Sequence, residues 1–187
     1  MLKIGVSGIE GSYSEEAAGI YARKNKIKDY EVVYLMDTEN VLKNLADKKI
    51  EVGVFPIVNS IVGIVEMSVG PIKKYSFKIK DIFDMQINHN LMVKPGKKME
   101  DIKKVSSHLQ SLRQCGKFLK SRLSDAEIIE LEDNGKAAKD LAEGRLSENT
   151  AVIASKAAAM LYGLEILEEG IQNIKDNRSA FLAVANI

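Results

Sequence analysis

Residues Lys3–Ala18, KIGVSGIEGSYSEEAA, contain the step from strand to helix that decides the fold class. The apolar run Leu2–Val6 is short and leads into a glycine-rich loop, which is typical of a buried parallel strand. Glu15–Lys24 has helical composition, with apolar residues at helical spacing. The loop between them holds Gly8 and Gly11 together with serines and a tyrosine. A plain turn needs at most one glycine and one capping serine, so this loop has a further role.

The same alternation continues along the chain. Glu31–Leu35 is short and β-branched, which predicts a strand, and TENVLKNLADKKI from Thr38 predicts an amphipathic helix. Glu51–Pro56 is a third strand, and such alternation predicts a parallel sheet with right-handed crossovers. In the second half we expect strands at 105–106, 126–131, 150–154 and 179–187, and helices at 110–123, 136–143 and 155–163.

Two segments interrupt the alternation. Residues 56–70, PIVNSIVGIVEMSVG, have no regular period, and residues 77–93 predict one long extended segment. We therefore expect an α/β protein with two lobes, of residues 1–80 plus 175–187 and residues 81–174, joined by extended crossovers. Hinged lobes of this kind place a ligand cleft between them. Periodicity alone leaves a single doubly wound sheet as the alternative.

The composition excludes several classes of protein. The chain has 187 residues and a formal net charge of +1 at pH 7, which provides no field for nucleic acid or an anionic membrane. No apolar run approaches the ~20 residues of a membrane span. Because strand-like residues start at Leu2, we expect no signal peptide. The single cysteine, Cys115, forms no internal disulfide. We expect a cytoplasmic protein without nucleic-acid or membrane partners.

The first loop has two interpretations. Ser12 stands three residues before Glu15, which is the spacing of a helix capping box. The backbone N–H groups and hydroxyls of Gly11–Ser14 are also suited to bind a carboxylate or phosphate at a helix start. No Gly-Lys-Ser/Thr follows, and the glycine spacing differs from that of a dinucleotide-binding loop. Anion binding and capping alone both remain open.

Ser107, His108 and Gln110 stand at the start of another predicted helix. Ser107 is a natural cap, which places His108 and Gln110 in the first turn. A single histidine is more often a local hydrogen-bonding residue than an acid or base. Neither His108 nor His89 has a ligand-spaced partner, so we expect no metal site. Cys115, further along the same helix, is expected to be a buried thiol.

Two further polar stretches lie beside predicted strand ends. Asn59 and Ser60 follow the third strand, at the edge of the sheet where open α/β folds bind ligands. Near the end of the chain, residues 176–181, DNRSAF, combine a turn with the guanidinium of Arg178 and the hydroxyl of Ser179. The residues predict the turn, whereas the pattern alone does not define its chemistry.

Taken in order, these stretches resemble the catalytic domain of prephenate dehydratase. The family's first loop, roughly Gly-Pro-x-Gly-Thr/Ser-Phe/Tyr-Ser, is similar to Gly8–Ser14. Its Pro-Ile-Glu-Asn-Ser corresponds to Pro56–Ser60, and its Ser-His-Pro-Gln-Ala-Leu-x-Gln-Cys to Ser107–Cys115. Its last motif, Asn-x-Thr-Arg-Phe, appears as Asn177–Phe181. The resemblance covers nearly the whole chain.

The resemblance implies two α/β lobes of the type II periplasmic-binding-protein kind, with a ligand cleft between them. It places the first loop on one wall of that cleft, the helix that begins at Ser107 on the other, and Ser179 at the hinge. Two helix N-termini suit a small-molecule carboxylate, and in particular a dicarboxylate such as prephenate. The expected substrate-binding residues are Gly11, Ser12, Tyr13, Ser14, Ser107, His108, Gln110, Arg178 and Phe181.

The resemblance also implies a reaction. In the family, the ring hydroxyl of prephenate leaves as the ring carboxylate departs as carbon dioxide, without a metal or organic cofactor. The enzyme would be a carbon–oxygen lyase of phenylalanine biosynthesis. Neutral hydroxyl and amide groups can assist the leaving hydroxyl, so we expect Ser179, Asn59 and Ser60 to be catalytic. Ser179 keeps the hydroxyl of the family's threonine without the methyl that restricts its rotamer.

Departures from the family pattern leave alternatives open. The glutamate before Asn-Ser is Val58 here, and the arginine of the last motif is Ala180. Losing an arginine–carboxylate contact typically costs ~2–5 kcal/mol, unless Arg178 or Lys136 replaces the charge. The chain is therefore expected to be a prephenate dehydratase that tolerates these changes, an enzyme acting on a related carboxylated molecule, or a non-catalytic binding or interaction protein on the same scaffold.

Two further expectations concern regulation and assembly. The family's C-terminal ACT domain, which binds phenylalanine, has no counterpart in these residues, so we expect no feedback regulation of that type. The apolar segment Ile79–Val93 is a candidate surface for a homodimer.

Overall fold

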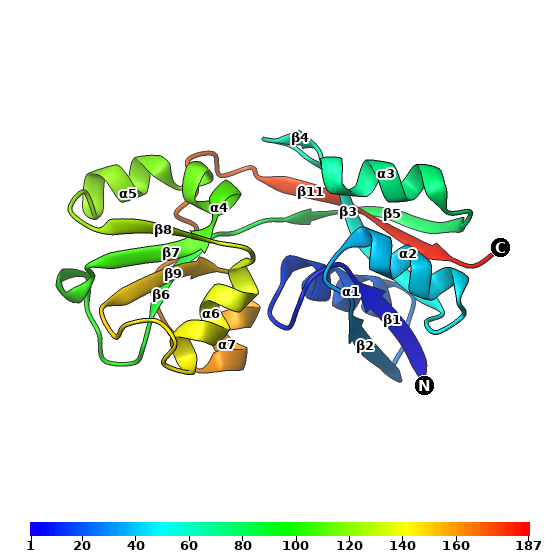
Figure 1. The fold of residues 1–187 in the computed structure, drawn as a ribbon, viewed down its shortest axis with the longest axis horizontal. Helices are drawn as coiled ribbons and strands as arrows, with labels where there is room; N and C mark the ends of the chain where they lie inside the picture. The colour runs from blue at the N-terminus through cyan, green and yellow to red at the C-terminus, as the bar shows by residue number, and fades with distance from the viewer. The chain divides into compact units, whose positions relative to one another are not determined.

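The computed structural model describes all residues, Met1–Ile187, and they form two compact units. Unit 1 comprises Met1–Ile9, Tyr13–Ile87 and Asp176–Ile187, and unit 2 comprises Glu10–Ser12 and Asn88–Lys175. Each unit is built on its own sheet with helices packed on it (Figure 1). The predicted α/β class is therefore confirmed.

Unit 1 contains a sheet of order β2-β1-β3-β11-β5, with the short β4 paired to β3. Its strands are β1 (Leu2–Val6), β2 (Tyr30–Tyr34), β3 (Val52–Asn59), β4 (Gly63–Ile64), β5 (Lys78–Gln86) and β11 (Arg178–Ala185). Its helices are α1 (Tyr13–Lys24), α2 (Thr38–Ala46) and α3 (Glu66–Lys74). β1 is parallel to β2 and to β3, as the strand–helix alternation predicts.

The last strand of the chain lies inside the sheet of unit 1. β11 runs between β3 and β5 and is antiparallel to both (Figure 1). Phe181 packs in the apolar cluster under α1, whereas Leu182 packs in the cluster under α2, because side chains alternate across a strand. This pairing places the first residues of β11 beside the last residues of β3.

The chain leaves unit 1 after β5 rather than near residue 80. β5 pairs with β11 along Lys78–Gln86, which keeps these residues in unit 1, and unit 2 begins again at Asn88. The single extended segment predicted for residues 77–93 is two strands, β5 in unit 1 and β6 (Asn90–Val93) in unit 2.

Unit 2 contains a sheet of order β10-β6-β9-β7-β8. Besides β6, its strands are β7 (Lys104–His108), β8 (Glu127–Leu131), β9 (Thr150–Ala154) and β10 (Glu165–Glu168). Its helices are α4 (Leu109–Gln114), α5 (Gly116–Arg122), α6 (Asn134–Ala142) and α7 (Lys156–Tyr162), with a 3-10 turn at Met99–Asp101. α4 and α5 cover one apolar face of the sheet and α6 and α7 the other.

The helix predicted at residues 110–123 is broken at Cys115. The backbone of Cys115 leaves the helical region, with φ −102° and ψ 7°, so that α4 ends there and α5 begins. The Cys115 side chain is buried, and burial raises the pKa of its thiol to about 12. The expectation of a buried thiol is confirmed.

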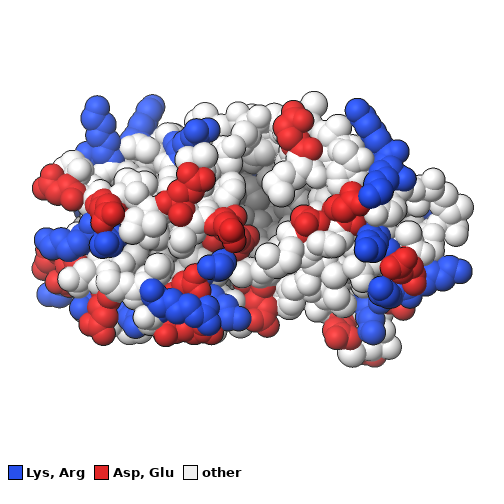
Figure 2. All heavy atoms as spheres, in the orientation of Figure 1, with Lys and Arg blue, Asp and Glu red and all other residues white.

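Charged side chains of both signs are mixed over each unit on the face shown in Figure 2. This agrees with the interleaved lysines and acids of the sequence. None of the helices reaches the length and apolar character that a membrane crossing requires.

His89 is a buried neutral side chain of unit 2 that should make the fold sensitive to acid. Its Nε2 lies 2.7 Å from Gln114 Oε1, and burial lowers the pKa of the imidazole below its usual value. The imidazole of the unfolded chain therefore binds a proton more readily than that of the folded chain. The stability that neutral His89 contributes above about pH 6.5 is lost as the pH falls through the folded pKa. Urea titrations between pH 7 and 5 should show a slope up to about 1.4 kcal/mol per pH unit steeper for the wild type than for His89→Gln. Equal slopes would contradict this origin.

Candidate active site

Asn59 and Ser179 face each other where β3 ends and β11 begins. They are register partners across the two strands. Asn59 Nδ2 donates to Ser179 Oγ at 3.0 Å and to Asn177 Oδ1 at 2.8 Å. Asn59 and Ser179 are 8% exposed and Asn177 is fully buried. The structure thus brings two predicted catalytic residues together in what we call the Ser179 cluster (Asn59, Asn177 and Ser179).

The orientation of the Asn59 amide is fixed by the turn that follows β3. Asn59 Oδ1 accepts the backbone N–H groups of Ile61 and Val62, at 3.0 and 3.1 Å. Because the oxygen is held there, the NH₂ group must point at Ser179. The Ser179 oxygen accepts in this contact, so the hydroxyl hydrogen is left to donate to another acceptor.

Ser60 and Arg178 hold the start of β11 by backbone contacts. Ser60 N donates to Arg178 O at 2.8 Å, and Arg178 N donates to Ser60 Oγ at 2.9 Å. The exposed Arg178 guanidinium is paired with Asp176, at 2.8 Å from Nε to Oδ1. Lys136, the other cation suggested by the sequence, pairs with Asp140 at 2.8 Å. Both candidate replacements for the missing arginine are therefore engaged in ion pairs.

Val58 and Ala180 are neighbours on the opposite face of the sheet. The register pairs them across β3 and β11, and pairs Ala180 with Asp84 of β5. Because side chains alternate along a strand, position 180 faces away from Ser179. The glutamate and arginine of the family pattern would therefore stand opposite each other as a cross-strand pair. Replacing both together removes that pair and leaves the Ser179 cluster unchanged.

A second polar cluster in unit 2 forms around Asn134, in the first turn of α6. Ser107 Oγ lies 2.6 Å from both Asn134 Oδ1 and Ile153 O, and is fully buried. Asn134 Oδ1 also accepts from the backbone N–H of His108 at 3.2 Å, and Asn134 Nδ2 donates to Ser111 Oγ at 2.9 Å. We call Ser107, Ser111 and Asn134 the Asn134 cluster, which fixes the junction of β7 and α4.

This junction leaves two side chains able to bind a ligand. His108 caps α4, and its Nδ1 accepts the backbone N–H of Gln110 at 3.3 Å. The neutral imidazole then carries its proton on Nε2, which becomes a donor. Both His108 and Gln110 are half-buried, and the Gln110 amide makes no hydrogen bond within the structure. Unlike Ser107, these two groups are available for a carboxylate.

Ser106 and Ser107 are adjacent, fully buried serines with opposite hydrogen-bonding states. Ser107 is bonded as described, whereas Ser106 Oγ has no partner. We expect Ser107→Ala to lower the free energy of unfolding by about 1 kcal/mol, because it removes the one hydrogen bond that the buried hydroxyl donates to Asn134 Oδ1 or Ile153 O. Ser106→Ala should be neutral or stabilising, because it removes an unpaired hydroxyl. Urea unfolding of the two variants measures this, and equal losses would contradict it.

The first loop is fastened to α7 within unit 2. Ser155 Oγ donates to Gly11 O at 2.8 Å, and the Tyr162 hydroxyl donates to Glu10 O at 3.2 Å. Gly11 has φ +79°, and a Cβ there would lie 3.0 Å from the Cβ of Ala158. This explains why glycine is needed at residue 11, which has a left-handed backbone pressed against a helix.

Gly11 and Gly96 form a matched pair for testing this close approach. Both have a left-handed backbone, with φ +79° and +80°, but no atom lies within 4 Å of a Cβ built at Gly96. We expect Gly96→Ala to cost about 1 kcal/mol from backbone strain alone, and Gly11→Ala about 2 kcal/mol or more. Equal losses in urea unfolding would show that the contact with α7 does not restrict this position.

The other residues predicted to bind substrate lie in more ordinary surroundings. Ser12 and Ser14 are buried, with Ser14 Oγ 3.3 Å from Ser7 Oγ. Tyr13 is half-buried against the apolar cluster under α1. Phe181 is buried and stacks on Phe83 with ring centroids 6.1 Å apart, so its packing within unit 1 is that of a core residue.

Three residues that hold these clusters or the first loop were not among the site residues expected from the sequence. Asn177 belongs to the predicted turn and to the family's last motif but is not among the expected site residues, yet its side chain is buried against Asn59. Ser155 is the N-cap of α7 and bonds the first loop. Asn134 precedes the predicted start of its helix, and this position was the one available signal. No group of three or more His, Cys, Asp or Glu side chains is arranged to hold a metal ion.

Comparisons with a family model and with curated proteins point to the same family. The sequence model of the prephenate dehydratase family matches residues 4–186. A bifunctional chorismate mutase/prephenate dehydratase from Pseudomonas aeruginosa is 30% identical over 99% of this chain and 49% of its own length. Other curated relatives, from Petunia hybrida and Arabidopsis thaliana, are named arogenate dehydratases. The chain spans less than half the length of these curated relatives.

Solved structures share the fold. A prephenate dehydratase from Arthrobacter aurescens, in complex with L-Phe, has a TM-score of 0.89 at 22% identity and covers 100% of this chain and 61% of its own. A nutrient binding protein from Burkholderia cenocepacia bound to methionine has a TM-score of 0.52 at 14% identity, over 99% of this chain and 85% of its own. The predicted periplasmic-binding-protein-like fold is confirmed, and the predicted cleft stays a prediction.

Proposed function

Because the chain belongs to the prephenate dehydratase family, we propose that it catalyses the decarboxylating dehydration of prephenate to phenylpyruvate. The bond between the ring and its carboxylate breaks, and its electron pair enters the ring, which becomes aromatic. The ring hydroxyl leaves and takes up one proton, so the products are phenylpyruvate, carbon dioxide and water. The enzyme would be a lyase of phenylalanine biosynthesis.

The observation that carries this proposal is the orientation of the Ser179 hydroxyl. Asn59 donates to the Ser179 oxygen, which leaves the hydroxyl hydrogen for the substrate. A hydrogen bond from Ser179 to the leaving hydroxyl stabilises that oxygen as the carbon–oxygen bond breaks. Ser60 contributes by bonding the backbone of Arg178, which positions Ser179 without touching the substrate.

Recognition of the substrate carboxylates is assigned to the start of α4. His108 Nε2 and the Gln110 amide are donors that no group of unit 2 uses. Asn134 Oδ1 accepts the backbone N–H of His108, so the backbone that carries these two donors is held in place. We assign Arg178, another predicted contact, to the structure of the turn instead, because Asp176 already pairs with it.

Parallel assays with prephenate and arogenate test the proposal, because relatives of the chain carry both names. Phenylpyruvate from prephenate, above the rate in buffer, supports it. Conversion of arogenate alone would move the activity to the related carboxylated substrate. A folded protein that converts neither compound would favour the non-catalytic binder, which calorimetric titration with both compounds would then reveal.

We also infer a cytoplasmic location and a homodimer as working proposals. β5 is an edge strand of its sheet, with Ile79 and Ile82 51% and 57% exposed. β6, in the same predicted segment, is buried, so the dimer surface would be limited to β5. Light scattering of the wild type and Ile82→Glu tests the dimer, and fractionation of cells tests the location.

A further inference from the structure

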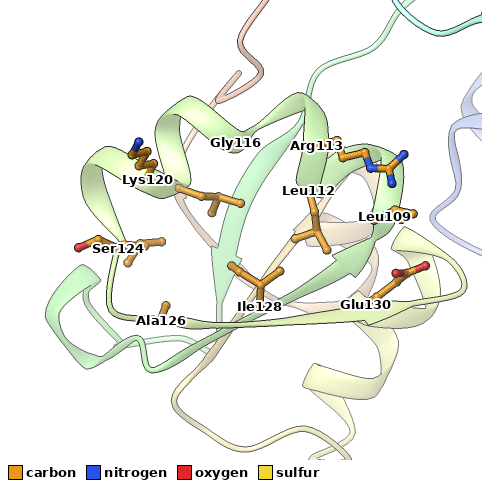
Figure 3. Close-up of a pocket in the computed structure, with 11 residues that line it drawn as sticks. Leu109, Leu112, Arg113, Gly116, Lys120, Ser124, Ala126, Ile128 and Glu130 are labelled. Atoms are coloured by element: carbon orange, nitrogen blue, oxygen red, sulfur yellow. The ribbon is translucent and has the colours of Figure 1, made fainter.

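We propose that a pocket over β8, in unit 2, binds a free α-amino acid with a large apolar side chain. The pocket has a volume of about 700 Å³ and lies between β8 and the helices α4 and α5 (Figure 3). This volume is within the usual range of small-molecule sites. Its floor is apolar and is made by Leu109, Leu112, Leu119, Leu123, Ala126 and Ile128.

The pocket exists because α4 and α5 do not fully cover the edge of the sheet. β8 is an edge strand, and Ile128 in its middle is 48% exposed beneath the two helices. The break at Cys115 separates the helices, so that Gly116 lines the pocket without a side chain. An apolar side chain of a ligand would shield Ile128 and the leucines from water.

Charged groups at the rim define the class of ligand. Arg113 and Glu130 stand at one end of the pocket beside Leu109, and Lys120 stands at the opposite end (Figure 3). None of these three side chains belongs to a salt bridge, unlike Lys104, Lys136 and Arg178 elsewhere in the chain. The end with Arg113 and Glu130 therefore offers one positively charged and one negatively charged group to a ligand.

These two charges match the two charges of an α-amino acid. The Arg113 guanidinium suits the α-carboxylate, and the Glu130 carboxylate suits the α-ammonium. A simple carboxylate would pair with Arg113 but would be repelled by Glu130, which would keep no partner. An amine would pair with Glu130 but would be repelled by Arg113. Complementary charge at one end and an apolar floor beside it favour the zwitterion.

Methyl NMR of protein labelled at Leu and Ile tests the site, with L-leucine and L-phenylalanine as probes. We expect saturable shifts of the methyl groups of Leu112 and Ile128. Arg113→Gln and Ile128→Asp should weaken binding by roughly tenfold or more. Lys117→Gln is the matched control, because this exposed lysine of α5 does not line the pocket. The affinity of this variant for the probes should stay within about twofold of the wild type.

Two analogues of leucine test the charge argument, each lacking one of the two groups. Both 4-methylpentanoate and 3-methylbutylamine should bind roughly tenfold more weakly than leucine. Ser179→Ala should bind leucine as the wild type does, so this result is independent of the proposed reaction. Absence of saturable shifts, unchanged affinity in Ile128→Asp, or equal binding of 4-methylpentanoate would each overturn the proposal.

Discussion

Ser179→Ala is expected to lower kcat for prephenate by about 10²–10³-fold, which is the usual loss when a hydrogen-bond donor that stabilises developing negative charge is removed. The hydroxyl is the group that would meet the leaving oxygen, and alanine provides nothing in its place. Asn59 keeps its contacts with Asn177 and with Arg178 O, so the fold should lose no more than about 1 kcal/mol. Steady-state rates and a thermal melt measure the two effects separately.

Ser179→Thr is the matched control for this prediction. Threonine keeps the hydroxyl and adds the methyl group that is present in the family's motif, which narrows the choice of rotamer. We expect it to retain the activity of the wild type within about tenfold. An alanine variant as active as the threonine variant would show that the hydroxyl takes no part in the reaction.

Asn59→Leu is expected to impair both folding and activity. The change removes the acceptor of the backbone N–H groups of Ile61 and Val62 and the donor to the Asn177 oxygen. Val62 is 47% exposed, so its N–H can bind water instead, and we expect a total loss of about 1–3 kcal/mol. The melting temperature should fall by about 2–4 °C for each kcal/mol, and turnover should fall with Ser179 no longer held.

Asn59→Asp separates the two roles of this side chain. Aspartate has nearly the same shape and can still accept from Ile61 and Val62, but it cannot donate to Ser179. It should therefore keep the turn after β3 and still lose most of its turnover, although its second oxygen then faces the Asn177 and Arg178 oxygens. A fully active Asn59→Asp variant would show that the donated hydrogen bond does not orient the hydroxyl.

Local patterns in the sequence were sufficient to predict most of the strands, because each of them is a short apolar run. β1 and β9 have the predicted bounds, and the predicted order of strands and helices holds for most of both units. The missed elements are those that depend on tertiary contacts. α3 forms although Pro71 lies inside it, and Ser68 in its first turn bonds Pro56 O at 2.7 Å and Thr38 Oγ1 at 2.9 Å. Such contacts override a weak local preference.

In the candidate site, too, the features that depend on tertiary contacts could not be predicted from the sequence. The sequence supplied Asn59 and Ser179, but only the antiparallel register of β3 and β11 makes them partners. The same register shows that Ala180 and Val58 share the other face, which a linear motif does not reveal. The roles of Asn134 and Asn177 were not predicted, because the role of a buried asparagine follows from its partners, and these partners lie far away in the sequence.

The most direct test of the central claim is the formation of phenylpyruvate from prephenate by the purified 187-residue chain, with released carbon dioxide measured in the same sample. We predict one carbon dioxide per phenylpyruvate, at a rate far above that of prephenate in buffer. A folded chain that forms phenylpyruvate no faster than buffer would contradict the assignment of Ser179 and Asn59 to this reaction.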